Sequence, residues 1–195
     1  MSDVTEDNRA IARAAAAEFG GKPSVTRFWD DQDSSAVDIL ECPDSPTEGV
    51  TSCSTLGLSD HPLVRDGNEY PVRVEVVGAG ATDNEHFPNI ISTIAFSIIN
   101  DQWFCSPGSI FPDVVGMYYP AATMRHILFV PPFLWADELE TMHFPGKTVA
   151  WLQAVPISEG ERQYATANGS DALQDLFVQN QIDVFNLDRD STVAE

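Results

Sequence analysis

The chain has 195 residues, 43% of them hydrophobic, and a formal net charge of −20 at pH 7. This length and composition are typical of one globular domain with a packed core, and no run approaches the roughly 18 apolar residues of a membrane span. The charge argues against nucleic acid and anionic membranes as partners and favours a basic protein, although a solubility effect or adaptation to salt is the simpler explanation of charge alone.

The N-terminal part, residues 1–49, is predicted to form a helix and the first strand of the domain. Residues 6–19 place apolar side chains at every fourth position and are followed by two glycines, which predicts an amphipathic helix that ends there. Residues 36–41, AVDILE, are a candidate for a short strand. The first ten residues carry acids where a secretory signal carries Lys or Arg, so we expect a cytoplasmic protein.

The segment PVRVEVVGAG has a valine at every second position, with Arg73 and Glu75 between the valines. This period of two predicts a half-buried strand whose charged side chains face solvent. Gly78 and Gly80 lack the third glycine of a dinucleotide-binding fingerprint, so we interpret them as a glycine-rich turn.

Residues 84–100 carry the clearest helical pattern of the chain. Apolar residues, mostly isoleucine, return every three to four positions and form a stripe wide enough to lie on a sheet. Asp83 or Asn84 is expected to cap the start of this helix.

Farther along the chain, RHILFV is predicted to be a central strand that stops at two prolines. LETMHF and KTVAWLQAVPI flank Pro145-Gly146, which predicts a hairpin. Ser158 and Glu161 have the spacing of a capping box and predict a new helix, with a second helix at about 171–180. The tail IDVFNLDRD is expected to pack as a last strand or an extended arm.

Together these elements predict a single α/β domain of the α+β kind, with a mixed, mainly antiparallel sheet flanked by helices. The 84–100 helix is expected on one face of that sheet. Residues 191–195 are expected to form a short tail.

Motifs that mark common active sites are missing from the sequence. It contains no P-loop, no GxSxG elbow and no HExxH pair. The cysteines, Cys42, Cys53 and Cys105, form no CxxC pair and are expected to be reduced residues of the core. We therefore expect no catalytic set, no metal and no cofactor.

Ser59, Asp60 and His61 are the three residue types of a hydrolytic triad, but sequence neighbours cannot form the relay. A small hydrolase that uses Ser59 with distant partners, or a histidine–carboxylate pair, is the alternative left open. His126 and His143 would be neighbours if their strands pair. The simpler interpretation is a turn in which Asp60 binds local backbone N–H groups.

Two tryptophans are large apolar anchors with different expected places. Trp151 lies in an apolar run and is expected in the core. Trp135 precedes Asp137 and Glu138 and is expected on the surface as a contact residue.

Several segments in order, TLGLSDHPL, FVPPFLWADELET, VAWLQAVPISEGERQYATANGSDALQDLF and IDVFNLDR, resemble the suppressor-of-fused domain family over about residues 50–190. The resemblance implies a non-enzymatic protein-binding domain and, for a bacterial member, an immunity protein that neutralises a toxin domain. The predicted partner contacts are Ser59, Asp60, His61, Trp135, Asp137 and Glu138.

We therefore expect an immunity-type inhibitor that occludes a basic toxin or another basic protein. The hydrolase and a housekeeping interaction scaffold stay as alternatives. On the binding hypothesis the joint VAWLQAVPISEGE is scaffold, a core strand that leads into a capped helix.

Overall fold

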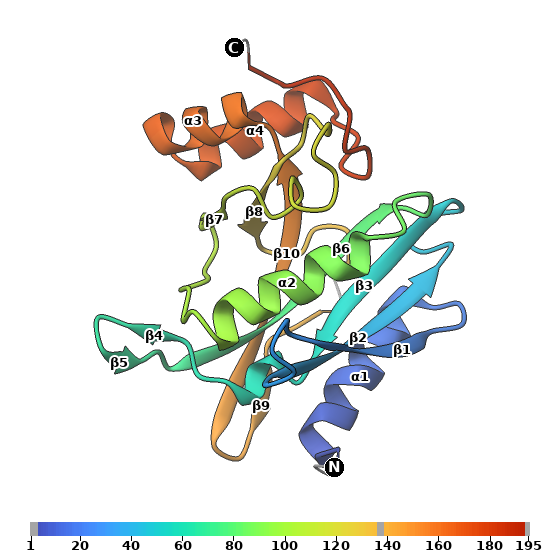
Figure 1. Cartoon of the computed structure of the whole chain (residues 1–195), viewed down its shortest axis with the longest axis vertical. Helices are drawn as coiled ribbons and strands as arrows, with labels where there is room; N and C mark the ends of the chain where they lie inside the picture. Colours follow the sequence, from blue (N-terminus) through green and yellow to red (C-terminus); the bar gives the residue numbers. More distant parts are fainter. Residues whose placement is uncertain (1–3, 136–138, 194–195) are drawn as a thin grey trace.

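The computed structural model describes residues 4–135 and 139–193 and shows a main sheet with helices on both faces and at one end, and a separate two-stranded sheet (Figure 1). The helices are α1 (Glu6–Phe19), α2 (Phe87–Ile99), α3 (Glu159–Asn168) and α4 (Ser170–Asn180), with a 3-10 turn at Leu58–Asp60. The strands are β1 (Ser24–Trp29), β2 (Ala36–Pro43), β3 (Val50–Leu56), β4 (Val64–Arg65), β5 (Asn68–Glu69), β6 (Val72–Ala81), β7 (Ile110–Phe111), β8 (His126–Val130), β9 (Met142–Phe144) and β10 (Lys147–Ile157).

The main sheet has the order β1-β2-β3-β6-β10-β8-β7, and β9 pairs with β10 off this path. Strands β6 and β10 run parallel, while the other described pairs are antiparallel. The parallel pair is joined by a long connection that contains α2, as a parallel crossover requires. The predicted α+β domain with a mixed, mainly antiparallel sheet is confirmed.

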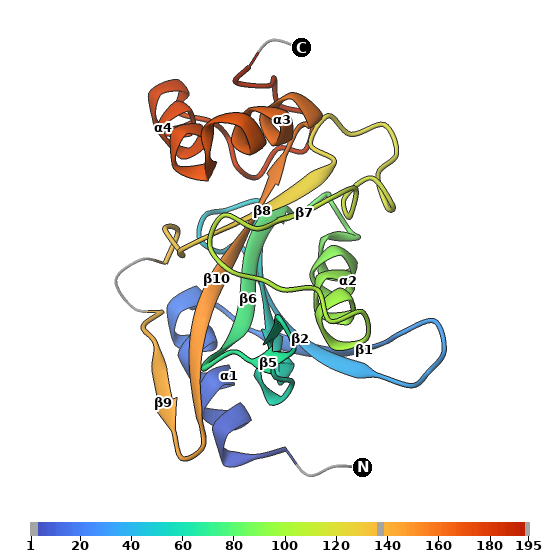
Figure 2. The same ribbon diagram turned by 90° about the vertical axis from the view of Figure 1, so that its left-hand side faces the viewer.

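Helix α1 has the bounds that the sequence predicts. The side chain of Thr5 accepts a hydrogen bond from the backbone N–H of Asn8 at the start, and Gly20, with φ of 67°, ends the helix. Helix α1 lies on the face of the sheet opposite α2 (Figure 2), and its side chains Ile11 and Phe19 are buried in the core on that face. Helix α1 contacts β2 and β3 on this face.

Strand β6 is buried on both faces, so the prediction of a half-buried strand is wrong. Glu75, expected to face solvent, is fully buried. The alternation of apolar and polar residues shows that successive side chains point to opposite faces of the sheet, but it does not show whether another element covers each face. Here α2 covers one face and α1 covers the other, so both faces are buried. Gly78 and Gly80 belong to this strand rather than to a turn.

The two glycines of β6 make room for Phe87, the first residue of α2. A Cβ added at Gly80 would lie 2.7 Å from Phe87 Cδ2, closer than packed carbon atoms approach.

Helix α2 starts later than predicted, and neither Asp83 nor Asn84 caps it. The N-cap residue is His86, whose side chain makes no capping hydrogen bond.

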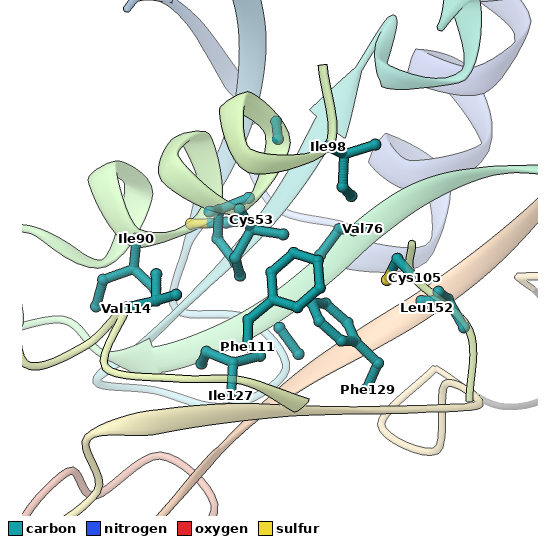
Figure 3. Packing of buried hydrophobic residues seen from close by; sticks show 14 of the residues in the cluster. Cys53, Val76, Ile90, Ile98, Cys105, Phe111, Val114, Ile127, Phe129 and Leu152 are labelled. Carbon is teal, nitrogen blue, oxygen red and sulfur yellow. The ribbon is translucent and has the colours of Figure 1, made fainter. Parts of the chain in front are cut away.

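The isoleucine stripe of α2 is buried against the sheet as predicted and forms the larger core (Figure 3). Phe111 lies between this helix and the sheet and contacts Phe129 edge-on, with ring centroids 4.8 Å apart. The three cysteines are free and buried.

The C-terminal elements follow the predicted turns and caps. Gly146, with φ of 97°, closes the β9–β10 hairpin. Ser158 and Glu161 form the complete capping box at the start of α3. After α4 the tail makes turns and forms no strand in its described part, yet Leu187 and Arg189 are buried.

No helix among the described residues is both long and apolar enough to cross a membrane.

Candidate functional site

The turn at residues 57–61, which holds three of the predicted contact residues, is built on the buried carboxyl group of Glu75. Glu75 Oε1 accepts hydrogen bonds from the backbone N–H groups of Gly57 at 3.1 Å and Ser59 at 3.0 Å, and Oε2 accepts one from Thr55 Oγ1 at 2.5 Å. Desolvation raises the pKa of Glu75 to about 7, although these hydrogen bonds act to lower it. Strand β6 therefore positions the turn through one side chain.

The carboxylate of Asp60 joins the turn to α1 and to β10. Its Oδ1 lies 2.7 Å from Lys147 Nζ on β10, and its Oδ2 accepts a hydrogen bond from Asn8 Nδ2 on α1 at 2.7 Å. Desolvation raises the pKa of Asp60, but the bonds from Lys147 and Asn8 outweigh it and keep the pKa below its ordinary value. The side chain is 43% exposed, so Asp60 presents an anion to solvent.

Ser59 lies beneath this surface. The residue is fully buried, and its Oγ is 3.3 Å from Lys147 Nζ. Arg73 Nη1 donates to the carbonyl oxygens of Ser59 and Asp60 at 3.2 and 3.0 Å, which holds the backbone of the turn. Within the described residues no histidine is hydrogen-bonded to Ser59; the basic side chain at its Oγ is Lys147, which also pairs with Asp60.

His126 and His143 would be neighbours only if their strands paired, but β8 and β9 each pair with β10 and not with each other, so the two histidines are far apart. His126 and His143 pair with Ile157 and Thr148 of β10, which are nine residues or about 30 Å apart along the strand. His126 Nε2 lies 2.9 Å from Glu159 Oε2, within ion-pair distance although not aligned for a hydrogen bond. This histidine–carboxylate pair is at the end of β10 opposite the serine turn.

A groove of about 700 Å³, here called the α1 groove, opens between α1, the β1–β2 pair and the turn. Asp60 and His61 line it on one side. Val25 and Trp29 of β1 line it on the other and are 55% and 54% exposed. Two predicted contact residues therefore border a cavity that also offers apolar surface, the combination typical of a protein-binding site.

A second groove of about 920 Å³, here called the α2 groove, lies where the β1–β2 pair meets α2 and the segment after it. Asp30, Asp31 and Asp101 contribute carboxylates to its lining, and Trp103 and Met117 contribute exposed apolar side chains. No Lys or Arg among the described residues lines it. Trp29 borders both grooves.

The expected surface position of Trp135 is wrong. The residue is 5% exposed and packs on Phe19 of α1, with ring centroids 5.0 Å apart. The acidic neighbours on which the expectation rested, Asp137 and Glu138, lie outside the described residues. Trp151 is buried in the same core, as predicted.

Sequence reasoning missed β1 and with it Trp29. The run SVTRFW is rich in β-branched and aromatic residues, which favours a strand, but it does not alternate because both faces of β1 are largely exposed.

Among the described residues, no group of three or more His, Cys, Asp or Glu side chains is placed to hold a metal ion.

Comparisons with known proteins are consistent among themselves. The family model described as suppressor of fused protein (SUFU) matches residues 33–190. Immunity protein YqcF of Bacillus subtilis (strain 168) is 50% identical over 190 residues, which cover 97% of this chain and 99% of that protein.

Two solved structures share the fold at low sequence identity. A putative SUFU homologue from Neisseria gonorrhoeae superposes with a TM-score of 0.68 and 14% identity over 96% of this chain and 97% of its own. A chain of the Sufu–Fu complex superposes with a TM-score of 0.65 and 13% identity over 94% and 91%.

Proposed function

Because the chain belongs to the suppressor of fused protein (SUFU) family, we propose that it is a non-enzymatic protein-binding domain, an immunity-type inhibitor that occludes a basic toxin. The observation that carries the proposal is its 50% identity to an immunity protein over almost the whole length of both chains. Inhibition by occlusion needs a preformed surface and no reacting group, which suits a turn whose serine is buried against a lysine.

The charge supports a basic partner. The chain has 30 acidic residues and 10 Lys or Arg residues, so a positively charged toxin is attracted over a long range. Such attraction raises the association rate more than the affinity and weakens with added salt. The same field repels nucleic acids and anionic membranes, and the proposal places the protein in the cytoplasm, where it meets the toxin.

We assign the contact surface to the α1 groove and its rim. Asp60 and His61 are the predicted contact residues that lie there, and the exposed Val25 and Trp29 add apolar area. Ser59 supports this surface from below, and Trp135 supports α1 from the core.

The test is co-expression of the chain with the toxin-like proteins encoded beside its gene. We expect one of them to arrest growth alone, the chain to restore growth, and the purified pair to form a complex whose dissociation constant rises steeply with salt. A neighbouring toxin that the chain neither neutralises nor binds would contradict the proposal. Binding to a harmless neighbour alone would favour the scaffold alternative.

A further inference from the structure

Strand β1 forms one edge of the sheet, and its outer side is free. In the part of the chain that the structure describes, β1 pairs with β2 alone. Five of its six residues are exposed, and Phe28 is half-buried. In Figure 2 the β1–β2 hairpin extends beyond α2.

The hairpin end identifies the backbone groups on the free side. Asp30 N donates to Ser35 O at 3.0 Å, so this pair is hydrogen-bonded across the hairpin. Antiparallel pairs alternate between hydrogen-bonded and non-hydrogen-bonded positions. Val25, Arg27 and Trp29 therefore point their N–H and C=O groups away from β2, toward solvent.

A free edge of this length is usually protected by charge, proline or a bulge, because it invites pairing with another chain. The single charge on β1 is Arg27, and it is engaged by Asp38 of β2 through two hydrogen bonds of 2.7 and 2.8 Å. Strand β1 contains no proline. The edge is therefore open to a further strand.

The two grooves on either side of β1 differ in chemistry. The α1 groove offers Val25 and Trp29 as apolar surface. The α2 groove carries Asp30, Asp31 and Asp101 without a lining cation among the described residues. Although desolvation raises the pKa of Asp30, hydrogen bonds from Ser34 and Asn100 lower it to about 2, so this carboxylate stays ionised.

We propose that the toxin binds by adding an extended, Lys- or Arg-bearing segment to the free edge of β1. Successive side chains of a strand point to opposite faces, so alternate residues of the added segment reach the two grooves. Apolar residues enter the α1 groove, and basic residues enter the α2 groove. This inference rests on the proposed function and specifies its contact mode.

The decisive variant is Val25→Pro, with Val25→Thr as its matched control. Proline removes one outward N–H, which is tolerated on an edge strand because β2 does not use it, whereas threonine keeps the N–H in a side chain of the same branched shape as valine. With the inactivated toxin-like protein encoded beside the gene as the probe, we expect at least tenfold weaker binding for Val25→Pro and no more than about threefold for Val25→Thr.

Charge provides a second variant pair. Asp31→Lys changes the α2 groove, and Asp175→Lys makes the same charge change at an exposed position of α4. Both alter the net charge equally, so a local role predicts that Asp31→Lys weakens binding several-fold more than Asp175→Lys.

Hydrogen exchange on the wild-type protein tests strand addition at β1 even if Val25→Pro fails to fold. We expect the toxin to protect the outward amides of Val25, Arg27 and Trp29. A wild-type complex without this protection would overturn the β1 inference and leave the inhibitor function standing. Absence of any complex would overturn the function itself.

Discussion

Arg189 of the C-terminal tail and Glu161 of α3 form a bidentate ion pair with both side chains buried. The two terminal guanidinium nitrogens lie 2.7 and 2.8 Å from Glu161 Oε1 and Oε2. Desolvation raises the pKa of Glu161, but the hydrogen bonds from Arg189 and Thr192 outweigh it and lower the pKa. Glu161 also accepts the N–H of Ser158 in the capping box. One carboxylate thus joins the end of β10, the start of α3 and the tail.

Replacing Arg189 with Met is expected to destabilise the protein by about 3–5 kcal/mol, because it leaves the Glu161 carboxylate buried without its cation. The free energy of unfolding in urea at pH 7 measures the loss. The control is Arg162→Met, which breaks a pair with Glu159 that is 37% and 42% exposed and is expected to cost about 0–1 kcal/mol. Equal losses of unfolding free energy in the two variants would contradict the larger contribution of the buried pair to stability.

Glu75 is expected to make stability depend on pH near neutrality. The folded protein keeps a proton on Glu75 up to a pKa of about 7, whereas the unfolded chain releases it near 4.5. The resulting stabilisation is present below pH 4.5 and is lost as the pH rises to about 7, a change of about 3 kcal/mol. Glu75→Gln does not titrate.

The measurement for Glu75 is the difference in unfolding free energy between wild type and Glu75→Gln at pH 4.5 and 7.5. We expect the wild type to lose about 3 kcal/mol relative to the variant over this range. A constant difference would mean that the group does not carry a raised pKa.

The close approach of Phe87 to Gly80 predicts that Gly80→Ala costs about 1–3 kcal/mol, because the added Cβ overlaps the ring. Phe87→Leu in the same chain should recover part of this loss, since the smaller side chain removes the overlap. A double-mutant cycle on thermal unfolding detects the coupling, and strict additivity would rule out the direct contact.

Ser158→Ala should cost about 1 kcal/mol, because the hydroxyl caps α3 by accepting the N–H of Glu161 at 3.1 Å. Thr166→Ala, at an exposed position of the same helix, should change stability little. Urea unfolding of both variants provides the comparison. Growth protection by Ser158→Ala should remain intact at 25 °C if the joint is scaffold only.

Ser59→Ala separates inhibition from catalysis. Its hydroxyl contacts Lys147 and is fully buried, so we expect unchanged protection against the toxin and a stability loss of no more than about 1 kcal/mol. Growth assays and circular dichroism melting measure the two effects. Loss of protection in a variant that melts like the wild type would revive the hydrolase hypothesis.

Local elements were predictable because their causes act over a few residues. The bounds of α1 follow from its apolar spacing and Gly20, and the capping box at Ser158 follows from a three-residue spacing. The start of α2 was misplaced because a turn, closed by a bond from Phe87 N to Asn84 O, occupies the residues where the helical pattern begins.

The candidate site was predictable only in part. Asp60 and His61 belong to the segment TLGLSDHPL, one of the segments that carry the resemblance to the family, and both line the α1 groove. Trp135 was wrongly expected on the surface and Trp29 was not singled out, because exposure depends on which distant element covers a side chain. Phe19 of α1 covers Trp135, whereas Trp29 lies on an edge strand that α1 leaves open.

By itself, then, the sequence determined the local elements, the acidic surface charge and the family. Only the tertiary structure decided that Glu161 meets Arg189, that Glu75 supports the turn at residues 57–61, and that β1 keeps a free edge. The physical reason is range: periodicity, caps and turns are set by neighbouring residues, whereas these three contacts depend on the order of strands in the sheet, which brings together residues far apart in the chain.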